Sequence, residues 1–125
     1  MRTTGLDAIG QVSRRVSDID VAVAWYRDVL GLRHLYSFGP LAFFDCGGTR
    51  LYLAAQGTGT PGADSVLYFG VTDIAASHAE LASRGVAFTD PPRLIHRHAD
   101  GVQEWMAFFT DPDGGVLALM SQTEP

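Results

Sequence analysis

The chain has 125 residues, of which 46% are hydrophobic and 18% charged, and its formal net charge at pH 7 is −5. This length corresponds to one ordinary domain, which buries roughly two-thirds of the surface of its unfolded chain. The acidic balance argues against a nucleic-acid partner, which needs clustered Lys and Arg. Every basic side chain is an arginine, a usage typical of a GC-rich bacterial genome.

Cysteine content and hydropathy bear on the compartment. Cys46 is the single cysteine, so no internal disulfide can form and a reducing compartment is expected. No apolar run approaches the roughly 20 residues of a membrane span, and no signal-peptide pattern opens the sequence. We therefore expect a cytoplasmic protein with no membrane partner.

The first predicted elements are a strand and a helix. Residues 1–10 lack strong periodicity and predict a partly ordered lead-in, whereas residues 11–16 alternate between two unlike faces, as a strand does. Asp18 follows as a helix N-cap, and apolar residues then recur at helical spacing until Gly31, which ends the helix. The apolar helix face comprises Ala22, Trp25, Tyr26, Val29 and Leu30.

Three further strands complete a first unit. Residues 34–38 and 41–46 predict two strands around a turn at Gly39-Pro40. A hairpin turn at Gly47-Gly48 leads to a strand over residues 50–55. The predicted order of the unit is β-α-β-β-β.

The same unit occurs a second time. Asp73 stands in the sequence VTDI, which repeats VSDI around Asp18 after 55 residues. A strand over residues 66–69 precedes it, and a helix with Ile74, His78, Leu81 and Ala82 on one face follows and ends at Gly85. Two copies of one unit predict a pseudo-symmetric single domain, because a solenoid needs three or more repeats.

The rest of the second unit is strand-rich. Strands are predicted over residues 86–89, 104–110 and 116–121, with tight turns at 99–101 and 111–115. Pro91-Pro92 interrupts the first of these strands, and residues 94–98 either resume it or form a loop. We divide the domain, residues 1–125, into module 1 (about 10–56), a Gly-, Thr- and Pro-rich linker (57–64) and module 2 (about 65–121).

Three segments resemble a known family. The segments VSDIDVAVAWYRDVLGL, VTDI and FFTDPDGGVLAL are similar to those of the vicinal oxygen chelate superfamily, over about residues 11–120. That group contains glyoxalases, extradiol dioxygenases, epimerases, fosfomycin-modifying enzymes and bleomycin-binding proteins. The resemblance implies an α+β fold in which two βαβββ modules form a cupped, incomplete barrel around a cavity. It also implies a homodimer, often with sites completed across the subunit interface.

The metal positions implied by the resemblance carry unsuitable side chains. They correspond to Gln11, Tyr52, Val66 and Ala118. Zinc, iron, manganese and nickel need imidazole, carboxylate or thiolate donors that converge on one point. Only Gln11 offers a plausible neutral donor, so we expect the usual metal site to be absent and predict no cofactor.

A displaced metal site is the alternative. His96 and His98 would project from one face of a strand, and with Glu104 they could form a two-histidine, one-carboxylate cluster. Such residues more often form a polar rim. His34 and His78 are expected to be structural.

Strand alternation also predicts a ligand-binding face. Its apolar and aromatic groups would supply affinity and its polar groups orientation for a small, partly aromatic molecule. The candidate ligand-binding residues are Gln11, Ser13, Arg15, Arg50, Tyr52, Tyr68, Trp105 and Met120. The opposite, core-facing set is Val12, Val16, Leu51, Leu53, Leu67, Phe69, Val71, Leu117 and Leu119. Aromatic strands usually pack inward, so a core position is the more common outcome for Trp105, Phe108 and Phe109.

No catalytic residue is assigned. Cys46 has no identifiable activating base, because Asp45 points to the other face of its strand, and an inert thiol is expected. Asp111 and Asp113 lie in a turn, where carboxylates usually bind backbone amides.

Three functions follow from these features. The first is a small-molecule-binding protein without the usual metal ligands, which sequesters an antibiotic or an aromatic metabolite. The alternative is a metal-dependent glyoxalase-like lyase or isomerase, or a dioxygenase, with displaced ligands. A metal-free enzyme is the third, so enzymatic activity stays open.

Overall fold

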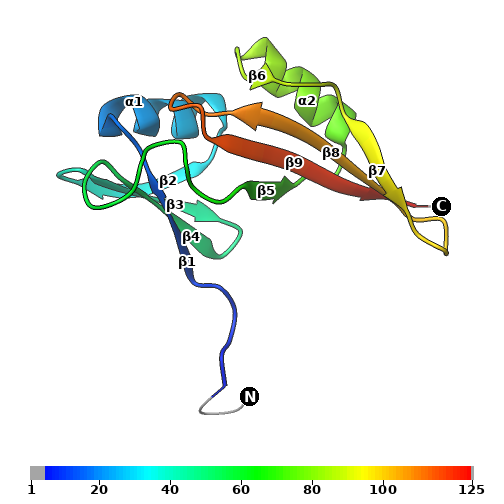
Figure 1. The fold of residues 1–125 in the computed structure, drawn as a ribbon, viewed down its shortest axis with the longest axis horizontal. Helices are drawn as coiled ribbons and strands as arrows, with labels where there is room; N and C mark the ends of the chain where they lie inside the picture. Colours follow the sequence, from blue (N-terminus) through cyan, green and yellow to red (C-terminus); the bar gives the residue numbers. More distant parts are fainter. Residues whose placement is uncertain (1–4, 125) are drawn as a thin grey trace.

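The computed structural model describes residues 5–124, which form two β-sheets side by side with helices on one side (Figure 1). Sheet A has the strand order β1-β4-β3-β2, with β1 parallel to β4 and the other pairs antiparallel. Its strands are β1 (Gln11–Arg15), β2 (Arg33–Phe38), β3 (Leu41–Cys46) and β4 (Thr49–Ala54).

Sheet B repeats this topology. Its order is β5-β9-β8-β6, with β5 parallel to β9, and β7 also pairs with β8. Its strands are β5 (Leu67–Gly70), β6 (Ala87–Phe88), β7 (Arg93–Arg97), β8 (Gln103–Thr110) and β9 (Val116–Thr123). The segment after Pro91-Pro92 is therefore a strand. The predicted α+β class with two βαβββ modules is confirmed, and neither sheet closes into a barrel within residues 5–124.

The helices begin and end where the sequence predicts. Helix α1 (Ile19–Ala24) continues into a π-helical turn, η1 (Trp25–Val29), and α2 is Ile74–Ser83. The Asp18 carboxylate accepts bonds from the backbone N–H groups of Asp20 and Val21, and Asp73 accepts one from Ala76. These caps satisfy donors that a helix start leaves unpaired.

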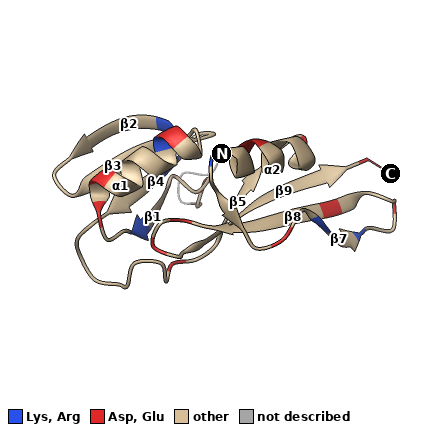
Figure 2. Cartoon of the chain, turned by 90° about the horizontal axis from the view of Figure 1, so that it is seen from above, with Lys and Arg blue, Asp and Glu red and all other residues tan. Residues whose placement is uncertain are grey.

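One hydrophobic core lies beneath both helices. Helix α1 covers sheet A and α2 covers sheet B on the same side of the molecule (Figures 1 and 2). The core contains side chains of both modules, among them Val16, Leu51 and Leu53 from the first and Leu117 and Leu119 from the second, as predicted. Within residues 5–124 both helices lie on this one side, and neither covers the other face of the sheets, which we call the open face.

A buried charged cluster joins the two modules. Arg14 of β1 points into the core with its side chain 1% exposed, and its Nη2 lies 3.3 Å from Oδ2 of Asp111, whose side chain is 2% exposed. The Tyr26 hydroxyl donates to the same Oδ2 at 2.9 Å, and Arg14 Nη1 donates to the Ser65 carbonyl at 2.6 Å. Burial raises the pKa of Tyr26 well above its ordinary value, so the phenol stays protonated as a donor.

The turn after β8 holds Asp111 in place. Asp111 Oδ1 accepts bonds from the backbone N–H groups of Asp113 and Gly115, at 3.0 and 2.8 Å, as expected for an aspartate in a turn. A Cβ atom on Gly115 would lie 2.7 Å from Arg14 Nη2, so a side chain at this position would displace the ion pair.

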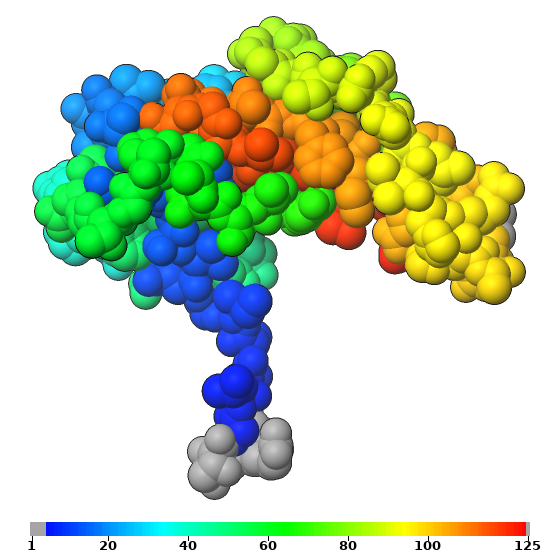
Figure 3. Space-filling view, in the orientation of Figure 1, coloured from blue at the N-terminus to red at the C-terminus, as the bar shows by residue number. Residues whose placement is uncertain are grey.

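Acidic and basic residues are scattered over both modules (Figure 2). The segment from Gly5 to Gly10 extends away from the body (Figure 3), and Leu6 is fully exposed there. No helix in the described part of the chain is long and apolar enough to cross a membrane.

The buried cluster leads to a stability prediction. Replacing Asp111 with alanine leaves the Arg14 charge buried without a partner, so we expect a loss of about 3–5 kcal/mol in the free energy of unfolding. Tyr26→Phe removes one hydrogen bond to a charged group and should cost less, about 1.5–3 kcal/mol. Urea denaturation of both variants measures the two losses. An Asp111→Ala loss smaller than that of Tyr26→Phe would contradict the role of the ion pair.

Candidate functional site

The open face of sheet A presents its side chains in three rows, because paired residues on neighbouring strands point to the same side. The first row is polar and charged, the second mainly aromatic and the third mixed. From β1 to β2 the rows are Gln11, Arg50, Asp45 and Arg33; Ser13, Tyr52, Phe43 and Tyr36; and Arg15, Ala54, Leu41 and Phe38. Five of the predicted ligand-binding residues therefore share this face: Gln11, Ser13, Arg15, Arg50 and Tyr52.

Four rings on this face form a continuous stack, which we call the aromatic array: Tyr36, Phe38, Phe43 and Tyr52. The Phe43 ring centroid lies 4.7 Å from that of Tyr36 and 4.9 Å from that of Tyr52. Phe38 stacks on Tyr36 with an interplanar angle of 6°. Phe38 is 58% and Tyr36 44% exposed, so the array offers ring surface to a partner.

Arg50 lies beside the array in a fixed position. Its Nε donates to Gln11 Oε1 at 2.8 Å, and its Cζ lies 5.2 Å from the centroid of the Phe43 ring. Its Nη1 lies 3.5 Å from the Tyr36 hydroxyl. Among the ion pairs of residues 5–124, none involves Arg50.

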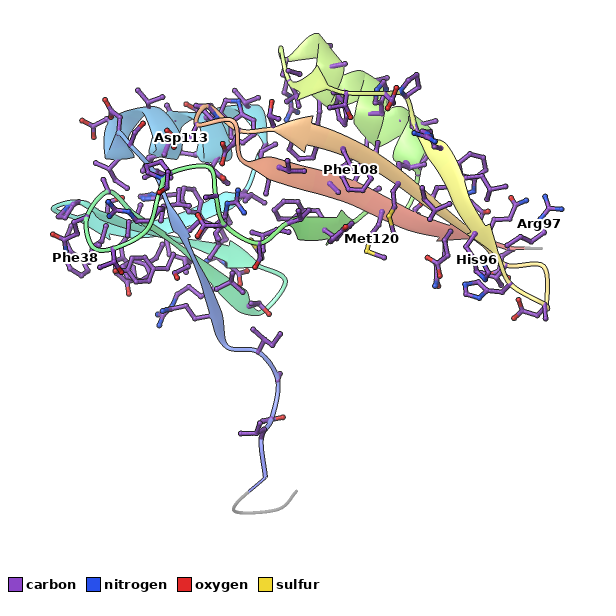
Figure 4. The ribbon with its side chains drawn as sticks, viewed as in Figure 1. Phe38, His96, Arg97, Phe108, Asp113 and Met120 are labelled. Atoms are coloured by element: carbon purple, nitrogen blue, oxygen red, sulfur yellow. The ribbon has the colours of Figure 1, made fainter. Side chains whose placement is uncertain are left out.

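The open face of sheet B is more apolar. Tyr68 of β5 is 46% exposed and meets the Phe108 ring edge to face at 5.9 Å. Met120 is paired with Met106 and shares this face. Figure 4 shows Phe38 on sheet A and Met120 on sheet B on the side of the sheets away from the helices. Two of the three predicted ligand-binding residues in sheet B, Tyr68 and Met120, are therefore on the open side.

Trp105 lies on the other face of sheet B. It packs against the hydrophobic core, and its Nε1 donates to Thr123 Oγ1 at 3.2 Å. Because successive strand residues point to opposite faces, Trp105 cannot share the face of Phe108 and Met120. Trp105 therefore does not lie with the other predicted ligand-binding residues of sheet B. The expected core position holds for Trp105 and Phe109, whereas Phe108 lies on the open face.

The four metal positions implied by the resemblance are divided between the sheets. Gln11 and Tyr52 lie on the open face of sheet A, Ala118 lies in β9 beneath Tyr68 and Phe108, and Val66 immediately precedes β5. The amide oxygen of Gln11 already accepts a bond from Arg50. The donor set therefore consists of one occupied amide, one phenol and two aliphatic side chains.

The alternative metal residues lie together at the far end of sheet B. His98 Nε2 is 2.8 Å from Glu104 Oε2, and the His96 and His98 ring centroids are 4.6 Å apart. The same Glu104 oxygen accepts a bond from Gln122 Nε2 at 2.6 Å. These bonds lower the pKa of Glu104. Residues 5–124 contain no group of three or more His, Cys, Asp or Glu side chains arranged to hold a metal ion.

A cleft of about 1020 Å³ lies where the modules meet. Two predicted ligand-binding residues, Arg50 and Tyr68, line it, together with Cys46 and core side chains of both modules. The cleft therefore borders the aromatic array at Arg50 but does not contain the array.

Three rings of the array were absent from the sequence-based candidates. Phe43 lies opposite Tyr52 because the two-residue turn Gly47-Gly48 pairs Cys46 with Thr49 and sets the register of the hairpin. Counting back from that turn would have placed Phe43 beside Tyr52. In the same way, the turn at Gly39-Pro40 sets the register of β2 against β3, which places Tyr36 opposite Phe43 and Phe38 opposite Leu41.

Solved structures with this architecture define the class of fold. An integron cassette protein from the mobile metagenome of V. cholerae matches with a TM-score of 0.77 and 19% identity, covering 96% of this chain and 98% of its own. A virulence protein from Salmonella typhimurium matches at 0.76 and 22%, covering 94% and 98%. A lactoylglutathione lyase from Agrobacterium tumefaciens matches at 0.71 and 21%, covering 93% and 94%. At these identities the likeness shows the fold alone.

The sequence itself identifies the family. The model of the Glyoxalase/Bleomycin resistance protein/Dioxygenase superfamily matches residues 8–119, so the chain belongs to that superfamily. The resemblance inferred from the motifs is confirmed. No curated protein sequence matches the chain.

Cys46 yields a prediction about reactivity. Burial, and then the neighbouring Asp45 carboxylate, raise the pKa of the Cys46 thiol, which reduces the thiolate fraction at neutral pH. We expect the native protein to react with a disulfide reagent such as DTNB more slowly than free cysteine at pH 7, with a rate that rises as the pH approaches the raised pKa and levels off above it. The urea-unfolded protein serves as the control and should react at an ordinary rate. A native rate faster than that of free cysteine would indicate an activated nucleophile.

Proposed function

We propose that this protein is a small-molecule-binding member of the superfamily that holds a partly aromatic organic ligand against the aromatic array without a divalent metal. The observation that carries the proposal is the array itself, with two exposed rings stacked on a third beside Arg50. Ring surfaces provide apolar area and stacking, and a few polar groups beside them orient a ligand. Reversible sequestration of an antibiotic or an aromatic metabolite needs nothing more.

The chemistry of the donor set supports binding without a metal. Gln11, the one suitable donor among the four implied positions, is bonded to a guanidinium. A divalent cation at Gln11 would have to approach the Arg50 charge, which repels it. Tyr52 in its neutral form is a poor ligand, and Val66 and Ala118 have no donor atoms. These residues do not fit a divalent metal.

The two open faces support a homodimer. Each sheet is covered by a helix on one side only, and the other side leaves Phe38, Tyr36 and Tyr68 between 44% and 58% exposed. Exposed apolar faces of this kind mark interaction surfaces. We propose that sheet B of a second copy covers sheet A, at the spacing of about 10 Å at which sheets pack, and encloses the ligand between them.

The metal-dependent alternative has weaker support. It would use His96, His98 and Glu104. However, Glu104 Oε2 is already hydrogen-bonded to His98 Nε2 and Gln122 Nε2. The cluster also lies at the opposite end of the molecule from Phe38 (Figure 4).

Truncating the centre of the array tests the binding proposal. Phe43→Leu removes the ring that contacts three others, so we expect a neutral aromatic probe such as 2-naphthamide to bind about two- to tenfold more weakly. Isothermal titration calorimetry measures the change. Phe88→Leu is the matched control, because Phe88 packs on the helix side of sheet B and should leave the affinity unchanged.

The same titration distinguishes metal-free binding from the metal-dependent alternative. We expect the affinity for 2-naphthamide to be identical with and without EDTA. Stoichiometric metal in protein purified without a chelator, lost on His96→Ala or Glu104→Ala substitution, would overturn the metal-free proposal.

Charge on the sheet B face tests the dimer. Met120→Glu places a carboxylate on the apolar open face. We therefore expect the wild-type protein to be a dimer and the variant to be a monomer that no longer binds 2-naphthamide. Sedimentation velocity reports the assembly state. Ser37→Glu, on an exposed position of the edge strand β2, controls for added charge. A wild-type protein that stays monomeric at all concentrations would refute the proposed closure.

A further inference from the structure

We infer that the ligand held by the aromatic array is an aromatic carboxylate and that Arg50 is the residue that selects it. This inference rests on the proposed function and names the ligand class of the same site. It follows from how Arg50 is held, from the charge on the open face of sheet A and from the order of the rows across that face.

Arg50 is positioned before any ligand arrives. Its Nε donates a hydrogen bond to Gln11 Oε1 at 2.8 Å. The centroid of the Phe43 ring lies 5.2 Å from Cζ of the guanidinium. A guanidinium has five N–H donors, and within residues 5–124 only Nε and Nη1 of Arg50 have side-chain acceptors. The remaining donors of a side chain already ordered are free for an anion, so little further rotamer entropy is lost on binding.

The open face of sheet A is basic although the protein is acidic. It carries two exposed arginines, Arg33 and Arg50, against one aspartate, Asp45, while Nε and Nη1 of a third arginine, Arg15, are buried. The chain as a whole has a net charge of −5. The Asp45 carboxylate accepts the backbone N–H of Gly48 at 3.1 Å and forms no ion pair in the described part of the chain. A local excess of positive charge attracts an anionic ligand.

The order of the rows on sheet A places charged side chains next to aromatic rings. Arg50 and Tyr52 are two residues apart on β4, so the charged row lies about 7 Å from the aromatic row. An aromatic acid that stacks on the array can therefore bring its carboxylate to Arg50. Gln11 thus acts as a positioning residue, because its amide oxygen holds a guanidinium at a position where metal-using relatives carry a ligand.

The test compares two probes that differ in charge, 2-naphthoate and its neutral analogue 2-naphthamide, by isothermal titration calorimetry at neutral pH and low salt. We expect wild-type protein to bind 2-naphthoate about tenfold more tightly, since a charge-assisted hydrogen bond is stronger than a neutral one. Arg50→Gln should abolish this preference, because 2-naphthoate loses its charge partner whereas the neutral 2-naphthamide loses at most a neutral hydrogen bond. Gln11→Glu should abolish it too, because the new carboxylate would neutralise Arg50.

Two further variants serve as controls. Arg97→Gln changes the net charge equally but lies at the far end of sheet B (Figure 4), so the preference should persist. Arg50→Lys keeps the charge without the planar fork, and a partial preference is expected. Thermal melts of each variant confirm that it is folded.

The outcomes separate this inference from the proposed function. Equal wild-type affinity for the two probes would overturn the carboxylate inference while the aromatic site stands. Binding of neither probe would overturn both. A preference that survives Arg50→Gln would refute the assignment of Arg50.

Discussion

The arrangement of the molecule depends on one buried charge. Arg14 lies in the core, and a guanidinium is tolerated there only with a counter-charge and hydrogen-bond acceptors. Asp111 supplies the charge from the second module, while the carbonyl of Ser65 and the hydroxyl of Tyr26 complete the cluster. The ion pair therefore links β1 to the turn before β9. This link helps to set the two sheets side by side with both open faces on the side away from the helices.

The duplicated topology carries two chemically different faces. Both modules use the same strand order, the same aspartate cap and a parallel pair between first and last strand. On sheet A the open face combines the aromatic array with arginines, whereas on sheet B it is formed mainly by Tyr68, Phe108 and methionines. Duplication thus supplies two faces with the same strand order, and divergence of their side chains makes one face aromatic and charged and the other mainly apolar.

The contact between Gln11 and Arg50 connects the fold to the proposed ligand. Gln11 and Arg50 are direct partners on two parallel strands, so the register of the sheet places the amide beside the guanidinium. Hydrogen bonding by Gln11 and stacking on Phe43 restrict a side chain that would otherwise move freely on the surface. A positively charged group is thereby built into the face by ordinary sheet pairing.

Local patterns in the sequence were sufficient for the elements and for the family. Cap residues, glycine stops and strand alternation depend on neighbours a few positions away, so both helices, the strand over residues 41–46 and the two-module division could be predicted. The β-bulge at Leu35, which turns Arg33 to the open face, left no such pattern. The burial of Arg14 and the position of Trp105 on the core side were likewise decided by tertiary structure. Arg14 contacts Asp111 and Trp105 donates to Thr123, and these contacts between distant parts of the sequence exist only once the chain has folded.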